Sequence, residues 1–149
     1  MKDEPPTAWP WVIAAVVFFI LVMACLGGPN FIALKHRVRM TEAGRMVDEI
    51  RRAELEYFER HLEYVPVIEP TPRSIETLDA ASVDWPSGTP FNQIGWRPDG
   101  PVRGTFTVRL APHGFVVEGW SDADGDGWIE HFRATESETV FRVDGGPPD

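Results

Sequence analysis

An acidic loop carries the clearest sign of chemistry in this sequence. Asp122, Asp124 and Asp126 stand at alternate positions, with glycines between and after them. Carboxylate oxygens are the hard ligands that Ca²⁺ prefers, and glycines let a loop curl around an ion. Glu130 follows four residues later and is a fourth candidate ligand, either directly or through a water molecule. The spacing therefore predicts a calcium site formed by Asp122, Asp124, Asp126 and Glu130.

The same loop permits another interpretation. It matches the first six positions of an EF-hand loop, but Arg133 stands where that motif needs a bidentate glutamate, so it is not an EF-hand. A hairpin turn whose Asp side chains accept backbone hydrogen bonds would have a similar composition. Three carboxylates in one loop repel one another without a cation, which favours Ca²⁺. We expect a dissociation constant on the order of 10⁻⁴–10⁻³ M, as in extracellular modules.

The other chemistry-bearing residues form no catalytic pattern. The four histidines are scattered, and neither a nucleophile turn nor a phosphate-binding glycine loop is present. Glu118 and Glu130 are candidates for a carboxylate pair, but strand alternation predicts that both are ordinary solvent-facing residues. The formal net charge of −9 argues against nucleic acid as a partner. The sequence thus predicts no enzyme, no catalytic residue and no small-molecule substrate.

An apolar segment lies far upstream of the acidic loop. No charged residue occurs from Trp11 to Leu26, and the apolar character continues to Leu34. Because a helix of roughly 20 apolar residues crosses a bilayer, we expect a transmembrane helix over residues 11–34, after an N-terminal flank of residues 1–10. Leu21–Cys25 also resembles a lipobox, although the acidic residues after Lys2 are unusual in a secretory signal. Acylation at Cys25 therefore stays open as an alternative.

The elements that must position the acidic loop follow this segment. Apolar residues recur every three or four positions over 35–64, which predicts an amphipathic continuation of the helix. Prolines make residues 65–104 a connecting loop. Residues 105–149 are expected to form an antiparallel sheet with the acidic loop and a flexible tail, one sheet face packing on the helix stripe. Alternation places its strands at residues 105–110, 115–120, 128–134 and 140–143.

This arrangement resembles type IV pilins and pseudopilins. The resemblance rests on Pro29-Asn30-Phe31-Ile32 followed by basic residues, on Thr41-Glu42-Ala43, and on Tyr57 and Tyr64 ahead of a Pro-rich loop. Two further segments look like parts of the same proteins, Phe91–Gly100 and Phe115–Ala134.

The chain departs from the family at its N-terminus. Aligning on Pro29 puts Thr7 where the cleavage-site glycine belongs and Val12 where the helix glutamate belongs. The chain therefore resembles a divergent or uncleaved member of the family.

The resemblance implies an α+β, pilin-like fold, in which a long N-terminal helix with a membrane-spanning first half packs on a small antiparallel sheet. It implies a structural subunit, a minor pilin or pseudopilin of a type IV pilus or a type II secretion system. Its partners would be membrane lipid, other pilin-like subunits and assembly machinery. The expected location is the inner membrane, single-pass, with the C-terminal domain periplasmic or extracellular, although the basic residues after Leu34 favour the opposite orientation. The alternative is a membrane-anchored, lipidated binding or accessory module that does not enter a filament.

Overall fold

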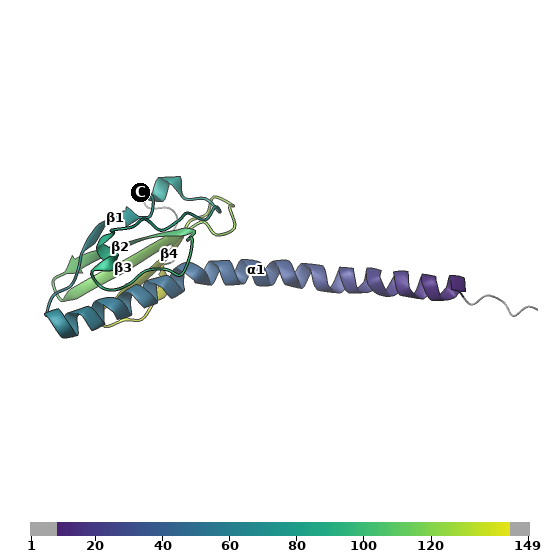
Figure 1. Ribbon diagram of the computed structural model, residues 1–149, viewed down its shortest axis with the longest axis horizontal. Helices are drawn as coiled ribbons and strands as arrows, with labels where there is room; N and C mark the ends of the chain where they lie inside the picture. Colours follow the sequence, from purple (N-terminus) through teal and green to yellow (C-terminus); the bar gives the residue numbers. More distant parts are fainter. Residues whose placement is uncertain (1–8, 144–149) are drawn as a thin grey trace, which may run out of the picture. The chain divides into compact units, whose positions relative to one another are not determined.

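The chain divides into two compact units, residues 1–35 and residues 36–149. The computed structural model describes the backbone of residues 9–143 and the side chains of residues 12–19 and 42–143. Helix α1 runs from Trp9 to His61 and so contributes residues to both units (Figure 1). We refer to residues 1–35 as the first unit and to residues 36–149 as the second unit.

The described side chains of the first unit are all exposed. They belong to residues 12–19 of α1, and the large apolar ones are between 50% and 70% exposed: Val12, Ile13, Val16, Val17, Phe18 and Phe19. Among the residues that the structure describes, no helix is both long enough and apolar enough to cross a membrane.

The second unit is built on a five-stranded antiparallel meander. Its strands lie in the order of the sequence, from β1 to β5. The strands are β1 (Val67–Thr71), β2 (Gly104–Ala111), β3 (Gly114–Ser121), β4 (Glu130–Thr135) and β5 (Phe141–Val143). Two 3₁₀ helices, η1 (Ile75–Thr77) and η2 (Pro90–Asn92), lie in the segment between β1 and β2.

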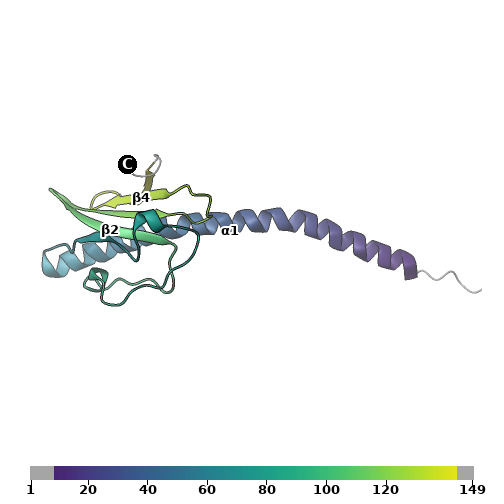
Figure 2. The ribbon, with the colours of Figure 1, turned by 90° about the horizontal axis from the view of Figure 1, so that it is seen from above.

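The C-terminal part of α1 packs on one face of this sheet (Figures 1 and 2). Met46, Val47 and Ile50 are buried in the same apolar cluster as the sheet residues. Alternation along the strands sends every second side chain to this face, which buries Phe106 and Val108 of β2 and Phe115 and Val117 of β3. Apolar burial on this scale is the main stabilising term of such a unit.

The connecting segment adds an aromatic layer to the core. The Trp85 ring lies 5.4 Å from Phe91 and 5.2 Å from Trp96, and both Trp85 and Trp96 contact Phe106 of β2. Arg73 fixes the start of the segment, because its guanidinium donates to the carbonyl oxygens of Ala81 (2.9 Å) and Arg103 (3.0 Å). Residues 65–104 therefore form a packed cover on the sheet and contribute its first strand.

These findings correct the predicted fold class. We expected a pilin-like helix with a membrane-spanning first half on a small sheet, but the described residues contain no helix able to cross a membrane. The second unit is mainly a sheet domain, since the Pro-rich segment supplies β1 and two 3₁₀ helices. Strand β1 was not predicted because its segment is rich in proline. An edge strand tolerates Pro70 because one side of its backbone needs no hydrogen-bond partner.

The location predicted from the apolar segment is corrected for the same reason. A single-pass inner-membrane protein needs a spanning helix, and none is found among the described residues. The assignment of a transmembrane helix is therefore wrong for this part of the chain. The proposed acylation site, Cys25, lies outside the residues whose side chains are described, as do the N-terminal flank and the tail after Val143.

Candidate metal centre

The three aspartates of the acidic loop come together between β3 and β4. One carboxylate oxygen each of Asp122, Asp124 and Asp126 lies within 4.8 Å of the others. Asp122 is 4% exposed, whereas the other two are exposed. Gly125 (φ +77°) and Gly127 (φ +82°) adopt left-handed backbone that other residues rarely reach, and this lets the loop turn back on itself. The sequence-predicted aspartates thus converge.

The loop also contains the hydrogen bonds of an aspartate-rich turn. Asp122 accepts from the backbone N–H groups of Gly125 (2.9 Å) and Gly127 (3.2 Å), and Asp126 accepts from Trp128 (2.8 Å). A carboxylate has about four acceptor sites, so these bonds leave room for a cation. The two interpretations of the loop are therefore compatible, with turn hydrogen bonds orienting carboxylates that face one another.

Glu130 does not join this group. It begins β4, is 6% exposed, and its Oε1 atom lies 2.8 Å from Nη1 of Arg142 on β5. Burial raises the pKa of Glu130; Arg142 lowers it, and the negative charges of Asp124 and Asp126 raise it further. The charges of Asp124 and Asp126 therefore act on Glu130, the fourth predicted ligand, but its own charge is compensated by Arg142.

The two glutamates expected at the solvent face are in fact buried. Glu118 is 8% exposed and pairs with Arg133 across β3 and β4, whereas Glu130 pairs with Ser121. Because residues 130 and 133 lie on opposite sides of one strand, the two glutamates occupy opposite faces of the sheet and form no carboxylate pair. The prediction that both side chains face solvent was therefore wrong: both are buried, and Glu130 lies on the same face of the sheet as Phe132 and Ala134.

Glu118 is the centre of a charged cluster that the sequence did not reveal. Its carboxylate forms an ion pair with Arg109, and its Oε1 atom lies 3.2 Å from Nε2 of His131. The hydrogen bond from His131 is the main cause that lowers the pKa of Glu118, burial opposes it, and Arg109 adds to the lowering. The Trp120 ring stacks on His131 at 4.9 Å. The cross-strand register (Trp120 opposite His131) could have suggested this cluster once the strands were aligned.

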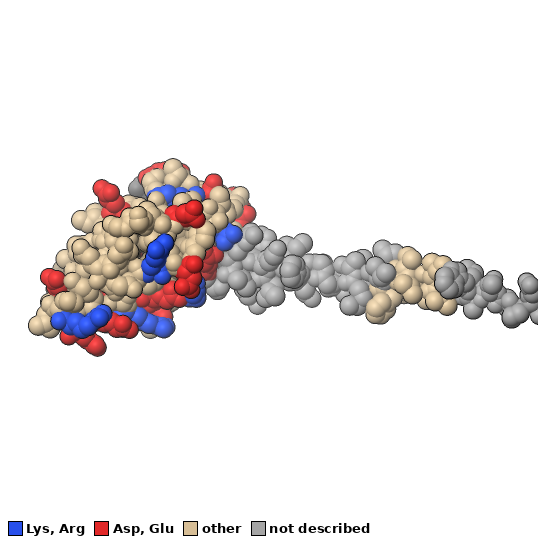
Figure 3. Space-filling model, in the orientation of Figure 1, with Lys and Arg blue, Asp and Glu red and all other residues tan. Residues whose placement is uncertain are grey.

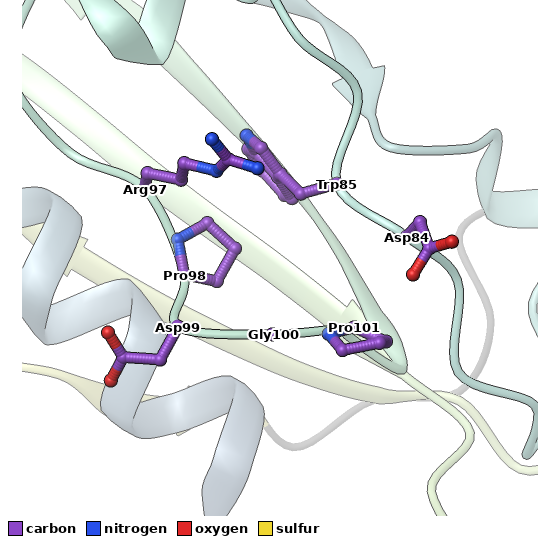
Figure 4. A pocket seen from close by; sticks show the side chains of 7 residues that line it. All are labelled: Asp84, Trp85, Arg97, Pro98, Asp99, Gly100 and Pro101. Carbon is purple, nitrogen blue, oxygen red and sulfur yellow. The ribbon is translucent and has the colours of Figure 1, made fainter.

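A shallow pocket of about 230 Å³ lies in the connecting segment (Figure 4). Its lining residues are Asp84, Trp85, Arg97, Pro98, Asp99, Gly100 and Pro101. In Figure 4 the Arg97 side chain lies beside the Trp85 ring, with Asp84 and Asp99 on either side of the pocket. None of these lining side chains is a Ser, Cys, Lys or His; the charged groups in the pocket are the carboxylates of Asp84 and Asp99 and the guanidinium of Arg97.

Acidic side chains are a prominent feature of the visible face of the second unit (Figure 3). Comparison of the chain with protein-family models, with curated proteins and with solved structures finds no match. No family evidence therefore supports a pilin, a pseudopilin, a fimbrium or a secretion system. The pilin resemblance rests on the quoted residues alone.

Proposed function

We propose that this chain is a structural subunit that assembles with other subunits through its apolar N-terminal helix, the role that the pilin resemblance implies. The exposed apolar side chains of residues 12–19 carry this proposal. A helix that is apolar on all sides is normally buried. Burying a side chain of this size stabilises by about 1.5–3 kcal/mol, so covering residues such as Phe18 and Phe19 supplies a strong drive for assembly.

The six apolar side chains point to helix packing as the mode of assembly. Val12, Val16 and Phe19 follow one another at spacings of four and three, and Ile13 and Val17 extend the neighbouring row. Such rows form the ridges that enter the grooves of another helix. A partner with an equally apolar helix, including a second copy of this chain, would cover them.

The experiment is sedimentation velocity on the full chain and on two matched variants. Phe18→Glu places a charge at a residue 70% exposed within the helix, and Ile68→Glu places the same charge at a residue 75% exposed on β1. We expect the wild-type chain to form discrete oligomers, Phe18→Glu to shift to the monomer, and Ile68→Glu to behave as the wild type. Equal behaviour of the two variants, or a monomeric wild type, would refute assembly through the helix.

A second proposal concerns the acidic loop, which we infer to bind Ca²⁺ weakly. It is supported by the three carboxylates that face one another within 4.8 Å and by the buried position of Asp122. An extracellular-type affinity of roughly 10⁻³ M would stabilise the fold by about 1.4 kcal/mol at ~10 mM Ca²⁺. That gain corresponds to a rise of about 5 °C in the melting temperature of a domain of this size.

Thermal melts with and without ~10 mM Ca²⁺ test this site. Asp124→Asn removes one charge from the group, and Asp99→Asn removes one from an exposed aspartate of the pocket. We expect Ca²⁺ to raise the melting temperature of the wild type and of Asp99→Asn, and to have little effect on Asp124→Asn. If Ca²⁺ leaves the wild-type transition unmoved, the loop is an aspartate-rich turn and no more.

A further inference from the structure

A carboxyl group is fully buried at the end of the helix in the second unit. Glu54 of α1 is 0% exposed and lies one helical turn after Ile50, on the face of α1 that packs against the sheet. Its Oε2 atom accepts a hydrogen bond from the backbone N–H of Val65 at 3.1 Å, while Oε1 is buried without a hydrogen-bond partner. A buried charged group in this situation is costly, because nothing replaces the water it has lost.

No cation compensates Glu54 in the part of the chain that the structure describes. The charge of Glu54 acts on Tyr57 of α1 and on Tyr64 after the helix. Glu136 from the β4–β5 turn hydrogen-bonds to Tyr64, and the groups around Tyr57 are Arg60, His61 and Glu63. Arg51, one turn earlier, donates instead to the carbonyl oxygens of Thr135 and Glu136. The hydrogen bonds described for Glu54 include no cation, so its burial favours the uncharged acid.

The hydrogen bond of Glu54 lies between the end of α1 and the edge strand β1. The helix ends at His61, Leu62 adopts left-handed backbone (φ 59°), and the chain turns to reach β1. Strand β1 is an edge strand that pairs with β2 alone, and its register is irregular between Val67 and Thr71. Edge strands and chain turns are the regions that open first in local unfolding. Val65, two residues before β1, is held to α1 through Glu54.

We propose that Glu54 is a proton-operated clasp: as the neutral acid it stays buried beside Val65 and keeps the edge strand β1 in place, whereas ionisation favours an open state in which water solvates its carboxylate. Burial raises the pKa of Glu54 from 4.5 to about 7, and the Val65 hydrogen bond opposes the rise. The folded value lies above the unfolded one, so the clasp is fully effective below pH 4.5 and weakens as the pH rises through 7. Its opening would expose the unpaired edge of β2 to a partner strand.

Amide hydrogen exchange of the full chain at pH 5 and pH 8.5 tests the clasp, with rates divided by the intrinsic exchange rate at each pH. We expect protection over residues 62–71 to fall at least tenfold between the two values while protection over β3 is kept. In Glu54→Gln, which has no ionisable group, protection over 62–71 should be the same at both values. Glu56→Gln, at an exposed position of the same helix, should behave as the wild type.

Three results would overturn the proposal. They are an unchanged protection over 62–71 in the wild type, an equal loss in Glu54→Gln, and a loss that is uniform over β3 and residues 62–71. If Glu54→Gln does not fold, as judged by circular dichroism, Glu54→Met, which also has no ionisable group, takes its place and should show the same protection over residues 62–71 at both pH values. A pH-dependent loss confined to residues 62–71 in the wild type and in Glu56→Gln supports the clasp, and any other distribution refutes it.

Discussion

Helix α1 approaches the sheet closely at Gly119 of β3. A Cβ atom at this position would lie 2.6 Å from Cγ2 of Val47 and 2.9 Å from Cδ1 of Phe106. Val47 and Phe106 are both 0% exposed, so neither has free space into which it can move. Gly119→Ala must therefore push α1 away from the sheet or force side chains off their preferred rotamers.

The expected cost follows from this crowding. Adding a methyl group to a well-packed core typically destabilises by about 1–3 kcal/mol. A domain of about 110 residues loses roughly 4 °C in melting temperature for each kcal/mol, so Gly119→Ala should melt about 4–12 °C below the wild type. Gly→Ala substitution also makes the unfolded chain less mobile, which stabilises by about 0.4–1 kcal/mol where the alanine fits. The comparison thus needs a second glycine substitution.

Gly100→Ala is the matched control, because no heavy atom lies within 4 Å of its added Cβ and its φ is not positive. Thermal melts followed by circular dichroism should place Gly100→Ala at or slightly above the wild type. The double variant Val47→Ala/Gly119→Ala removes the clashing methyl groups of Val47 and should be about 1 kcal/mol more stable than the sum of the single effects. If Gly119→Ala and Gly100→Ala have the same melting temperature, α1 does not approach the sheet as closely as described.

Two further predictions concern buried charges of the second unit. Arg73→Lys should lower the free energy of unfolding by about 2 kcal/mol in urea titrations. A lysine cannot reproduce the planar guanidinium that hydrogen-bonds to Asp79, Ala81 and Arg103. The control Arg45→Lys, at an exposed helix position, should have no measurable effect. The folded pKa of Glu118 is below its unfolded value of 4.5, so its contribution to stability is present above pH 4.5 and is lost as the pH falls. Melting temperatures of Glu118→Gln should therefore fall less than those of the wild type between pH 5 and pH 3, and parallel curves would show that Glu118 does not stabilise the fold.

Local patterning was a good guide to the later strands and a poor one to the first. Strands β2 to β5 lie within two residues of the ranges expected from alternation, and β2, β3 and β4 each have one face on the apolar core. Strand β1 was missed because Val67–Thr71 contains a proline and pairs along one side only. Val67, at 3% exposure, is its one buried residue, and one apolar position gives no alternating pattern that could be recognised in a Pro-rich segment.

The same limit explains the site residues. Asp122, Asp124 and Asp126 could be predicted to converge because they share one short loop, and loop geometry is a local property. Glu54 is different, since its position in the 3.6-residue period places it on the packed face of α1, while its charge suggests a solvent face. A pattern of residue types contains no information on which second segment, here Val65, supplies the hydrogen bond that makes burial tolerable.

Buried glutamates therefore mark where this fold departs from the simple rule that charges face water. Glu118 has the guanidinium of Arg109 beside it, and Glu130 has that of Arg142, so an opposite charge balances each carboxylate when it is ionised. Glu54 has only a backbone N–H, and its neutral form is the favourable one. Of these three buried glutamates, the one without a cation is thus the one whose ionisation we propose to open the structure, and it lies between the end of α1 and the edge strand β1.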